Sequence, residues 1–309
     1  VGTVQDDLLR AMLWGSLWDL VREAKLSPAS FATAALQALP QERDEQIAGV
    51  LTGRLLTATS RYGDRSLRDA MQDTITRVLL AGAVDTMRTY GQRKSQLDAL
   101  IGSASRSART DGQLLAQLDA WLDADTAAGL PLRAPTRWAI VTKLIGERHP
   151  TGMARLQAEA LRDSSSEGRR QAFVAAAAAP DSITKATYFA RWFGDSTLNE
   201  EWVTSSLRAF HDGDQEALTQ RYLVPSLDTL PWIQKNRRIF FLGAWLNAAI
   251  GGQNSATSLQ RIDDWLAAHP TLGADLRRKV LQSRDELERT VRIRRAFPGG
   301  GTTVQVGHD

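Results

Sequence analysis

Histidine and cysteine are the side chains that most often bind zinc, so their number and spacing indicate whether this chain can hold a metal. The histidines are far apart, and none is followed by another four residues later: His149, His211, His269 and His308. The HExxH pattern, which sets two zinc ligands on one helical face, does not occur, and cysteine is absent. The sequence therefore predicts no metal site, no bound cofactor and no catalytic residue in this chain.

Other motifs with a defined chemistry are missing as well. The P-loop, GxGxxG and GxSxG patterns do not occur. Glu200 and Glu201 are adjacent acids, and they suit the first turn of a helix, where the helix dipole favours carboxylates. This pair therefore predicts a helix start rather than a catalytic carboxylate pair.

A basic cluster at residues 277–279 could contact nucleic acid or an acidic surface. Aromatic residues that would stack on bases are not interleaved with it, and the net charge of the chain is only +3. Arg284 with Glu288, and Asp285 with Arg289, have the spacing of ion pairs within a helix. We therefore interpret the cluster as a solvated helix face and expect no nucleic-acid partner.

Helices must position these side chains, because the chain has no run of alternating polar and apolar residues typical of a strand. Helix starts of the N-cap type recur at Ser27, Asp111, Thr136, Ser164, Asp181, Asn199, Asp214 and Ser255. Proline and glycine separate the helices, and the connections are short. The pattern predicts an all-α protein in which consecutive helices pack antiparallel.

Composition is that of a globular protein, with 309 residues of which 43% are hydrophobic and 24% charged. The most apolar segment, Ile239–Leu246, is too short to span a bilayer, which takes about 20 residues. The first residues, VGTVQDD, lack the basic and apolar regions of a signal peptide. We therefore expect a cytoplasmic location without membrane contact. A chain that begins at Val1 indicates a part of a longer protein, and a processed or renumbered start is the alternative.

The first and last predicted helices differ in how much of their surface is apolar. In Asp6–Leu26 the apolar arc covers about 200°, whereas a surface helix needs little more than ~100°, which predicts neighbours on two sides. In Leu272–Arg295 the apolar stripe is about 60° wide, as in the capping helix of a solenoid. We assign residues 1–296 to one helical domain and residues 297–309 to a flexible tail. The arc of the first helix contains Leu9, Met12, Leu13, Trp14, Leu17, Leu20, Val21 and Ala24, and Trp18 lies one turn after Trp14.

Several segments, taken in order, resemble the C-terminal helical domain of M1 zinc aminopeptidases, which also occurs in the endoplasmic-reticulum aminopeptidases. Trp14–Arg22 is similar to the W-x-x-x-W-D-x-x-R segment at the start of that domain. Further similarities follow at Ala128–Leu132, Arg137, Trp138, Asp163, Gly168, the alanine run 172–179, Pro180, Lys185, Asn199, Phe210, Tyr222, Trp232 and 276–289. Each motif is short, and their common order over nearly all of residues 6–296 makes the resemblance specific. The bacterial enzymes are the most similar.

The resemblance implies a right-handed superhelix, a solenoid of HEAT-like antiparallel helix pairs. It also implies a parent enzyme that removes N-terminal amino acids from peptides with one zinc ion. An HExxH-x18-E motif binds that zinc and a GxMEN segment binds the substrate amine, both in an upstream thermolysin-like domain and both absent here. This chain is then expected to be a non-catalytic domain that caps the catalytic domain of the same polypeptide and encloses the chamber for the peptide substrate.

The concave face of such a stack can hold the C-terminal carboxylate of a peptide with arginine or lysine. Arg137, Lys143 and Lys185 are the candidates, and a salt bridge between helices is the alternative for each. A face that docks on the catalytic domain should be unusually apolar. Residues 239–241 could belong to that face, and burial in the domain's own core is the alternative.

Two other functions remain open from the sequence. One is a free-standing helical-repeat scaffold that binds a protein partner, and the other is a solenoid that binds nucleic acid. The coding sequence upstream of Val1 distinguishes the scaffold from the aminopeptidase domain, since an HExxH motif there supports the aminopeptidase. Salt-dependent binding of short RNA or DNA would support the third function.

Overall fold

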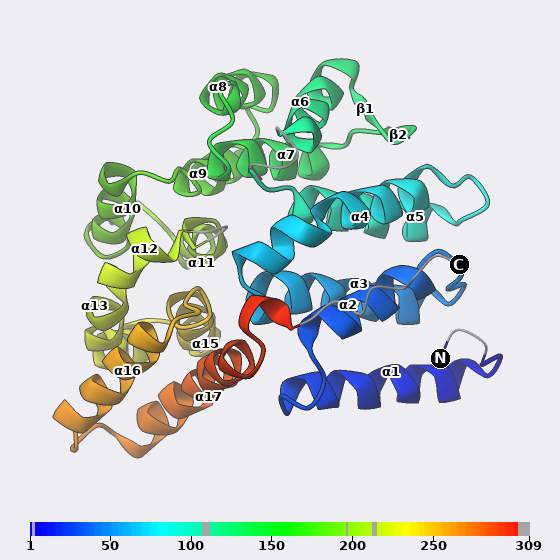
Figure 1. Ribbon diagram of the computed structural model, residues 1–309. Coiled ribbons are helices and arrows are strands. Elements are labelled where there is room, and N and C mark those ends of the chain that lie inside the picture. Colours follow the sequence, from blue (N-terminus) through cyan, green and yellow to red (C-terminus); the bar gives the residue numbers. More distant parts are fainter. Residues whose placement is uncertain (2–3, 107–111, 196, 212–214, 302–309) are drawn as a thin grey trace. The chain divides into compact units, whose positions relative to one another are not determined.

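The computed structural model describes residues 1, 4–106, 112–195, 197–211 and 215–301 (Figure 1). Over these residues the chain is almost wholly helical, with one hairpin of two short strands, which confirms the predicted all-α class. The chain divides into two compact units, Val1–Leu132 with Arg289–Asp309 (unit 1) and Arg133–Glu288 (unit 2). The single domain at residues 1–296 and the superhelical winding of the whole chain stay predictions.

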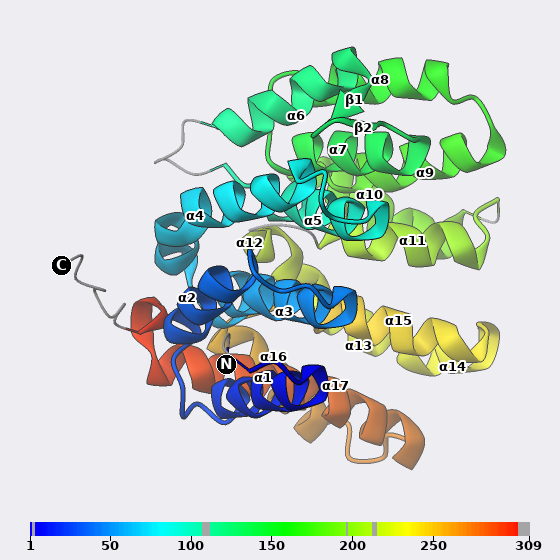
Figure 2. The ribbon, with the colours of Figure 1, turned by 90° about the vertical axis from the view of Figure 1, so that its right-hand side faces the viewer.

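Unit 1 is a set of helices joined by short connections, with α1, α2 and α3 as neighbours (Figure 2). Most of its helices begin at a side chain that accepts a hydrogen bond from the backbone nitrogen three residues later, at Asp6, Ser27, Asp44, Asp64 and Thr89. Such caps satisfy N–H groups that have no partner within the helix. The elements are α1 (Asp7–Arg22), α2 (Pro28–Ala38), α3 (Glu45–Thr57), the π-helix η1 (Ala58–Tyr62), α4 (Arg65–Val84), α5 (Tyr90–Ser103), α6 (Gln113–Ala124), β1 (Thr126–Ala127) and β2 (Leu130–Pro131).

Unit 2 is also a set of helices, and its first three, α7, α8 and α9, pack against one another. Its core is aromatic, with the rings of Trp192, Phe210 and Trp245 in contact. The elements are α7 (Ala134–Gly146), α8 (Gly152–Arg162), α9 (Ser166–Ala177), α10 (Ser182–Gly194), α11 (Glu200–Phe210), α12 (Glu216–Thr219), η2 (Gln220–Tyr222), α13 (Leu223–Asp228), α14 (Leu230–Asn236), α15 (Ile239–Ala249), α16 (Ala256–Ala268) and α17 (Ala274–Ala296), whose last turns belong to unit 1.

Four of the six predicted helix starts that lie within the described residues are confirmed. Ser27, Asp181, Asn199 and Ser255 are N-caps. The N-cap predicted at Thr136 is wrong by three residues, because the N-cap is Arg133 and Pro135 fits the first turn of α7, where it needs no hydrogen-bond acceptor. The predicted Ser164 is one residue early, since the hydroxyl of Ser165 accepts the cap hydrogen bond. Asp111 and Asp214 lie outside the described residues.

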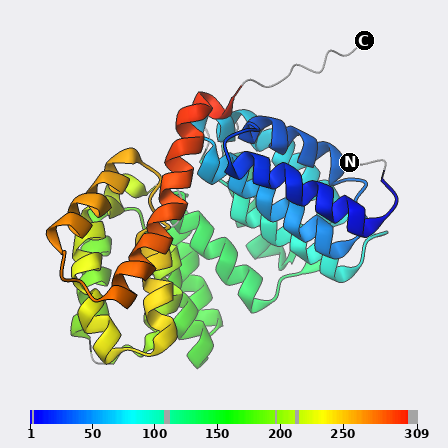
Figure 3. The same cartoon turned by 90° about the horizontal axis from the view of Figure 1, so that it is seen from below.

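Helix α1 has two neighbours, α2 and α3, but they leave part of the predicted apolar arc exposed, so the prediction that the whole arc is covered is wrong. Trp14 and Trp18 each pack on Phe31, with ring centroids 5.8 and 5.1 Å apart. Leu9 and Met12, which belong to the predicted arc, are exposed. Figure 3 shows α1, in dark blue, as the outermost helix of its unit on this side. The apolar arc is wider than this chain can bury.

Helix α17 buries a narrow stripe, as predicted, and its charged side chains are exposed or half-buried. Leu276, Val280 and Leu287 are buried. In the basic cluster, Arg278 and Lys279 both form ion pairs with Asp275. The predicted ion pair between Arg284 and Glu288 is present.

A short 3-10 turn, Pro298–Gly300, follows α17 within the predicted tail. The backbone nitrogen of Gly299 donates to the Asp64 carboxylate, 3.1 Å away, at the start of α4. Residues 302–309 lie outside the described part, so their flexibility stays a prediction. No helix among the described residues combines the length and apolarity that crossing a membrane would require.

Candidate functional site

Arg137, the first candidate for binding a peptide carboxylate, lies in a buried ion pair with Glu159 of α8. Its Nε is 2.8 Å from both carboxylate oxygens, and its Nη2 is 2.8 Å from Oε2. The two side chains are only 8% and 4% exposed. A buried pair with this geometry is costly to break, because the remaining charge would have no partner. The pair therefore ties α7 to α8.

Trp138, the next residue, belongs to a second polar cluster that fixes the start of α9. Its indole nitrogen donates to Asp163, 3.1 Å away, and the Ser165 hydroxyl donates to the same carboxylate at 2.6 Å. These two hydrogen bonds hold the pKa of Asp163 below its usual range. A side chain at Gly168 would place its Cβ 2.0 Å from the Asp163 carbonyl oxygen. The sequence motif of Trp138, Asp163 and Gly168 is thus explained by a close contact at a helix start.

Lys185, the third candidate, is fully buried and holds the carboxyl ends of two helices. Its Nζ donates to the carbonyl oxygens of Ala177 at 2.8 Å and Phe210 at 2.7 Å. It also lies 4.8 Å from the centroid of the Phe210 ring. Carbonyl groups in the last turn of a helix have no partner within the helix, and a cation is favourable there. Lys185 therefore connects the ends of α9 and α11.

Lys143, the second candidate, is in the last turn of α7 and only 8% exposed. All three candidates are thus inside unit 2 rather than on an open surface. Their binding of a peptide carboxylate stays a prediction, and it would require Arg137 and Lys185 to give up the partners that they have here.

The histidines have separate environments. His149 Nδ1 lies 2.8 Å from the Thr151 hydroxyl, and the His269 ring stacks on Trp265. His211, directly after α11, is half-buried with its Nδ1 shielded from solvent, and this desolvation, with a smaller effect of the Lys185 charge, lowers its pKa to about 3. His308 lies outside the described residues. Within the described part of the chain, no group of three or more metal-binding side chains is placed to hold an ion.

A groove that the sequence did not predict runs between α1 and α3 in unit 1. It has a volume of about 430 Å³. Leu8 on one wall and Val50 on the other are 73% and 51% exposed, and the floor includes the buried Trp14 and Leu51. We term it the α1–α3 groove; it is lined by Asp7, Leu8, Ala11, Trp14, Asp44, Gln46, Ile47, Val50, Leu51 and Arg54. Of the predicted apolar arc on the first helix, Trp14 alone lines the groove, so the width of that arc did not indicate it.

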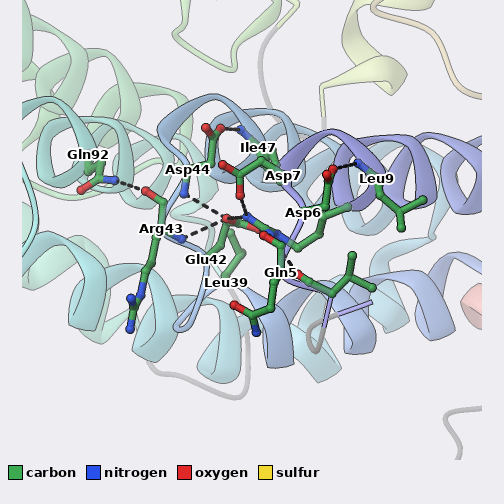
Figure 4. Close-up of polar contacts among 12 residues, drawn as sticks. Gln5, Asp6, Asp7, Leu9, Leu39, Glu42, Arg43, Asp44, Ile47 and Gln92 are labelled. Atoms are coloured by element: carbon green, nitrogen blue, oxygen red, sulfur yellow. Dashed lines mark hydrogen bonds and ion pairs between the residues drawn. The ribbon is translucent and has the colours of Figure 1, made fainter.

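Polar contacts fix the end of this groove where α1 and α3 begin. Arg10 binds the Glu42 carboxylate through two hydrogen bonds of 2.8 and 2.9 Å, and it also contacts Asp7 at 2.7 Å. Glu42 in turn accepts from the backbone nitrogens of Arg43 and Asp44 (Figure 4). Burial raises the pKa of Glu42, but the hydrogen bonds from Arg10 and the backbone outweigh it, and the pKa is lowered. The carboxylate therefore stays charged and holds α1 against the loop before α3.

Unit 2 has an exposed apolar patch at the start of α15. Ile239 and Phe240 are 78% and 87% exposed, whereas Phe241 is buried. Phe241 of the predicted segment 239–241 therefore belongs to the core, whereas a docking role for Ile239 and Phe240 stays a prediction. Arg237 lies 5.3 Å from the rings of both Trp232 and Phe241.

Comparison with known proteins gives a family and a relative. Residues 2–289 match the family described as ERAP1-like C-terminal domain. Aminopeptidase N of Streptomyces lividans is 29% identical over 302 residues, which cover 96% of this chain and 34% of that protein. The chain thus spans about a third of the length of this curated relative.

Proposed function

This chain belongs to the ERAP1-like C-terminal domain family, and we propose that it serves as the non-catalytic C-terminal domain of an M1 zinc aminopeptidase. In that role it caps the catalytic domain of the same polypeptide and encloses the chamber in which peptides lose their N-terminal amino acids. Zinc binds to the catalytic domain, not to this chain.

The proposal rests on one observation: the alignment covers nearly all of this chain but only a third of the relative. The relative with 29% identity is named aminopeptidase N, and 96% of this chain aligns with only 34% of it. About two thirds of that protein therefore lies outside the aligned part and has room for a catalytic domain. The geometry supports a scaffold role, since the charges of Arg137 and Lys185 join helices to one another.

Two measurements test the proposal. The purified 309-residue chain, assayed on an aminoacyl-arylamide with added zinc, should show no turnover, and clear turnover would overturn the proposal. The coding sequence upstream of Val1 should encode an HExxH-x18-E motif. A reading frame without one would refute the aminopeptidase assignment.

The second candidate function is a free-standing helical scaffold for a protein partner. The exposed apolar side chains of Leu8, Val50, Ile239 and Phe240 favour it, because contiguous apolar surface commonly marks a protein interface. The two functions predict genes of different length, because the gene of a free-standing scaffold would encode little more than these residues.

A further inference from the structure

We infer that the α1–α3 groove binds an amphipathic helix from the part of the longer polypeptide that this chain does not contain. The inference rests on the proposed function and adds to it the face that docks and the chemistry of the docking segment. The sequence relative extends over about three times the length of this chain, which leaves ample polypeptide to supply such a helix.

Apolar side chains on both walls of the groove are exposed. Leu8, on the α1 wall, is 73% exposed. Val50, on the α3 wall, is 51% exposed. An amphipathic helix that lies in a groove between two helices buries such side chains with its own residues at i, i+3, i+4 and i+7.

Trp14 provides an independent observation within the groove. It lines the groove, is only 3% exposed, and its indole nitrogen has no hydrogen-bond acceptor among the described residues. Buried donors are nearly always paired, because an unpaired one loses its hydration without compensation. A polar oxygen on the docking helix, such as a serine hydroxyl or a glutamine carbonyl, can accept this hydrogen bond.

The charged residues of the groove determine in which direction the docking helix lies. Asp7 and Asp44 lie at the end where α1 and α3 begin, and Arg54 lines the groove ten residues further along α3. The Asp7 side chain is 67% exposed although it pairs with Arg10, so it is accessible to a second cation. Complementary charge then requires lysine or arginine on the docking helix opposite Asp7 and Asp44, and a carboxylate opposite Arg54.

The experiment compares amide hydrogen exchange in the 309-residue chain and in the full polypeptide that its gene encodes. We expect peptides from α1 and α3 to exchange at least about tenfold more slowly in the full polypeptide. Leu8→Glu should abolish this extra protection and leave exchange in the 309-residue chain unchanged, because Leu8 is exposed there. Val50→Glu repeats the test from the other wall. Leu161→Glu is the matched control, since Leu161 is 84% exposed on α8 and outside the groove.

Each outcome is decisive. Protection that Leu8→Glu and Val50→Glu abolish, and that Leu161→Glu retains, supports the inference. Equal exchange of α1 and α3 in both proteins overturns it, as does protection that survives both groove variants. Protection at residues 239–240 that Phe240→Glu abolishes, with none at α1 and α3, would place the interface on unit 2 and overturn it too. A gene without an upstream catalytic region would refute the proposed function itself, and sequencing shows this before any exchange is measured.

Discussion

The ammonium group of Lys185 donates to two backbone carbonyl oxygens, at 2.8 and 2.7 Å, and has no exposed surface. One carbonyl belongs to the last residue of α9 and the other to the last residue of α11. A single side chain therefore supplies the hydrogen bonds that two helix ends lack. The role of Lys185 is therefore structural, and removing its ammonium group should destabilise the folded chain.

Replacing Lys185 by methionine should lower the free energy of unfolding by about 3 kcal/mol, because two buried carbonyl groups lose their donor. Urea unfolding followed by circular dichroism measures the change. Lys94→Met is the matched control, since Lys94 forms only a partly exposed i,i+4 pair with Asp98 and should cost less than ~1 kcal/mol. Equal losses for both variants would contradict the role of Lys185.

His211 should make stability depend on pH. In the unfolded chain its pKa is near the ordinary 6.5, whereas burial lowers the pKa in the folded chain to about 3. Between these values the unfolded state binds a proton that the folded state does not, so stability decreases as the pH falls from 6.5 toward 3. The expected slope from this group is about 1.4 kcal/mol per pH unit.

Urea unfolding at pH 7 and pH 5, with His211→Gln beside the parent chain, tests this dependence. The variant should lose most of the slope that the parent shows between these pH values, whatever its stability at pH 7. His149→Gln, in which a histidine near the surface is replaced, should retain the slope. An unchanged slope in His211→Gln would rule out His211 as its source.

At the scale of elements, polar clusters set where helices start and how they pair. Arg137 and Glu159 join α7 to α8, and Asp163, Ser165 and Gly168 form the start of α9. Both clusters use residues that the family resemblance singled out. Their positions indicate that these motifs preserve the helix packing of unit 2.

Breaking the ion pair on one side should cost more than removing both charges. Arg137→Met leaves Glu159 charged and buried, and it should lower the free energy of unfolding by about 3–5 kcal/mol. The double variant Arg137→Met/Glu159→Leu should be more stable than the single one, because no unpaired charge remains. Chemical denaturation of both variants gives the comparison. A double variant that is less stable than Arg137→Met would show that Glu159 is not a destabilising unpaired charge when Arg137 is absent.

Glycine at the start of α9 should be required for steric reasons. Gly168→Ala should destabilise by about 2 kcal/mol or more, since the added Cβ would lie 2.0 Å from the Asp163 carbonyl oxygen. Gly53→Ala in α3 has open space around its Cβ and should stabilise by about 0.5–1 kcal/mol through helix propensity. Thermal unfolding of both variants measures the contrast. A neutral Gly168→Ala would exclude this close approach.

At the scale of the whole molecule, zinc should have no part in the fold of this chain. The described residues contain no cluster of ligands for a metal, and cysteine is absent from the sequence. Dialysis against EDTA should therefore leave the melting temperature of the 309-residue chain unchanged, whereas it should abolish the activity of the full polypeptide. A melting temperature that falls with EDTA and recovers with zinc would reveal a metal site in this chain.

The sequence by itself determined the helical class, the position of most helix starts and the width of the apolar surface on each helix. These properties are local: a capping side chain binds a backbone nitrogen three residues away, and helical periodicity repeats every turn. The same local rules indicated that the first helix has more apolar surface than one neighbour can cover. They could not indicate which half of that surface stays open.

Only the tertiary structure decided the roles of the charged candidates. The partners of Lys185 are 8 and 25 residues away, and Glu159 is 22 residues from Arg137. A cation is attracted equally to a substrate carboxylate, a glutamate or a helix end, so its type and position in the sequence do not distinguish these partners. Packing of α7 to α11 brings particular acceptors within 3 Å of each cation, and burial then excludes the other partners.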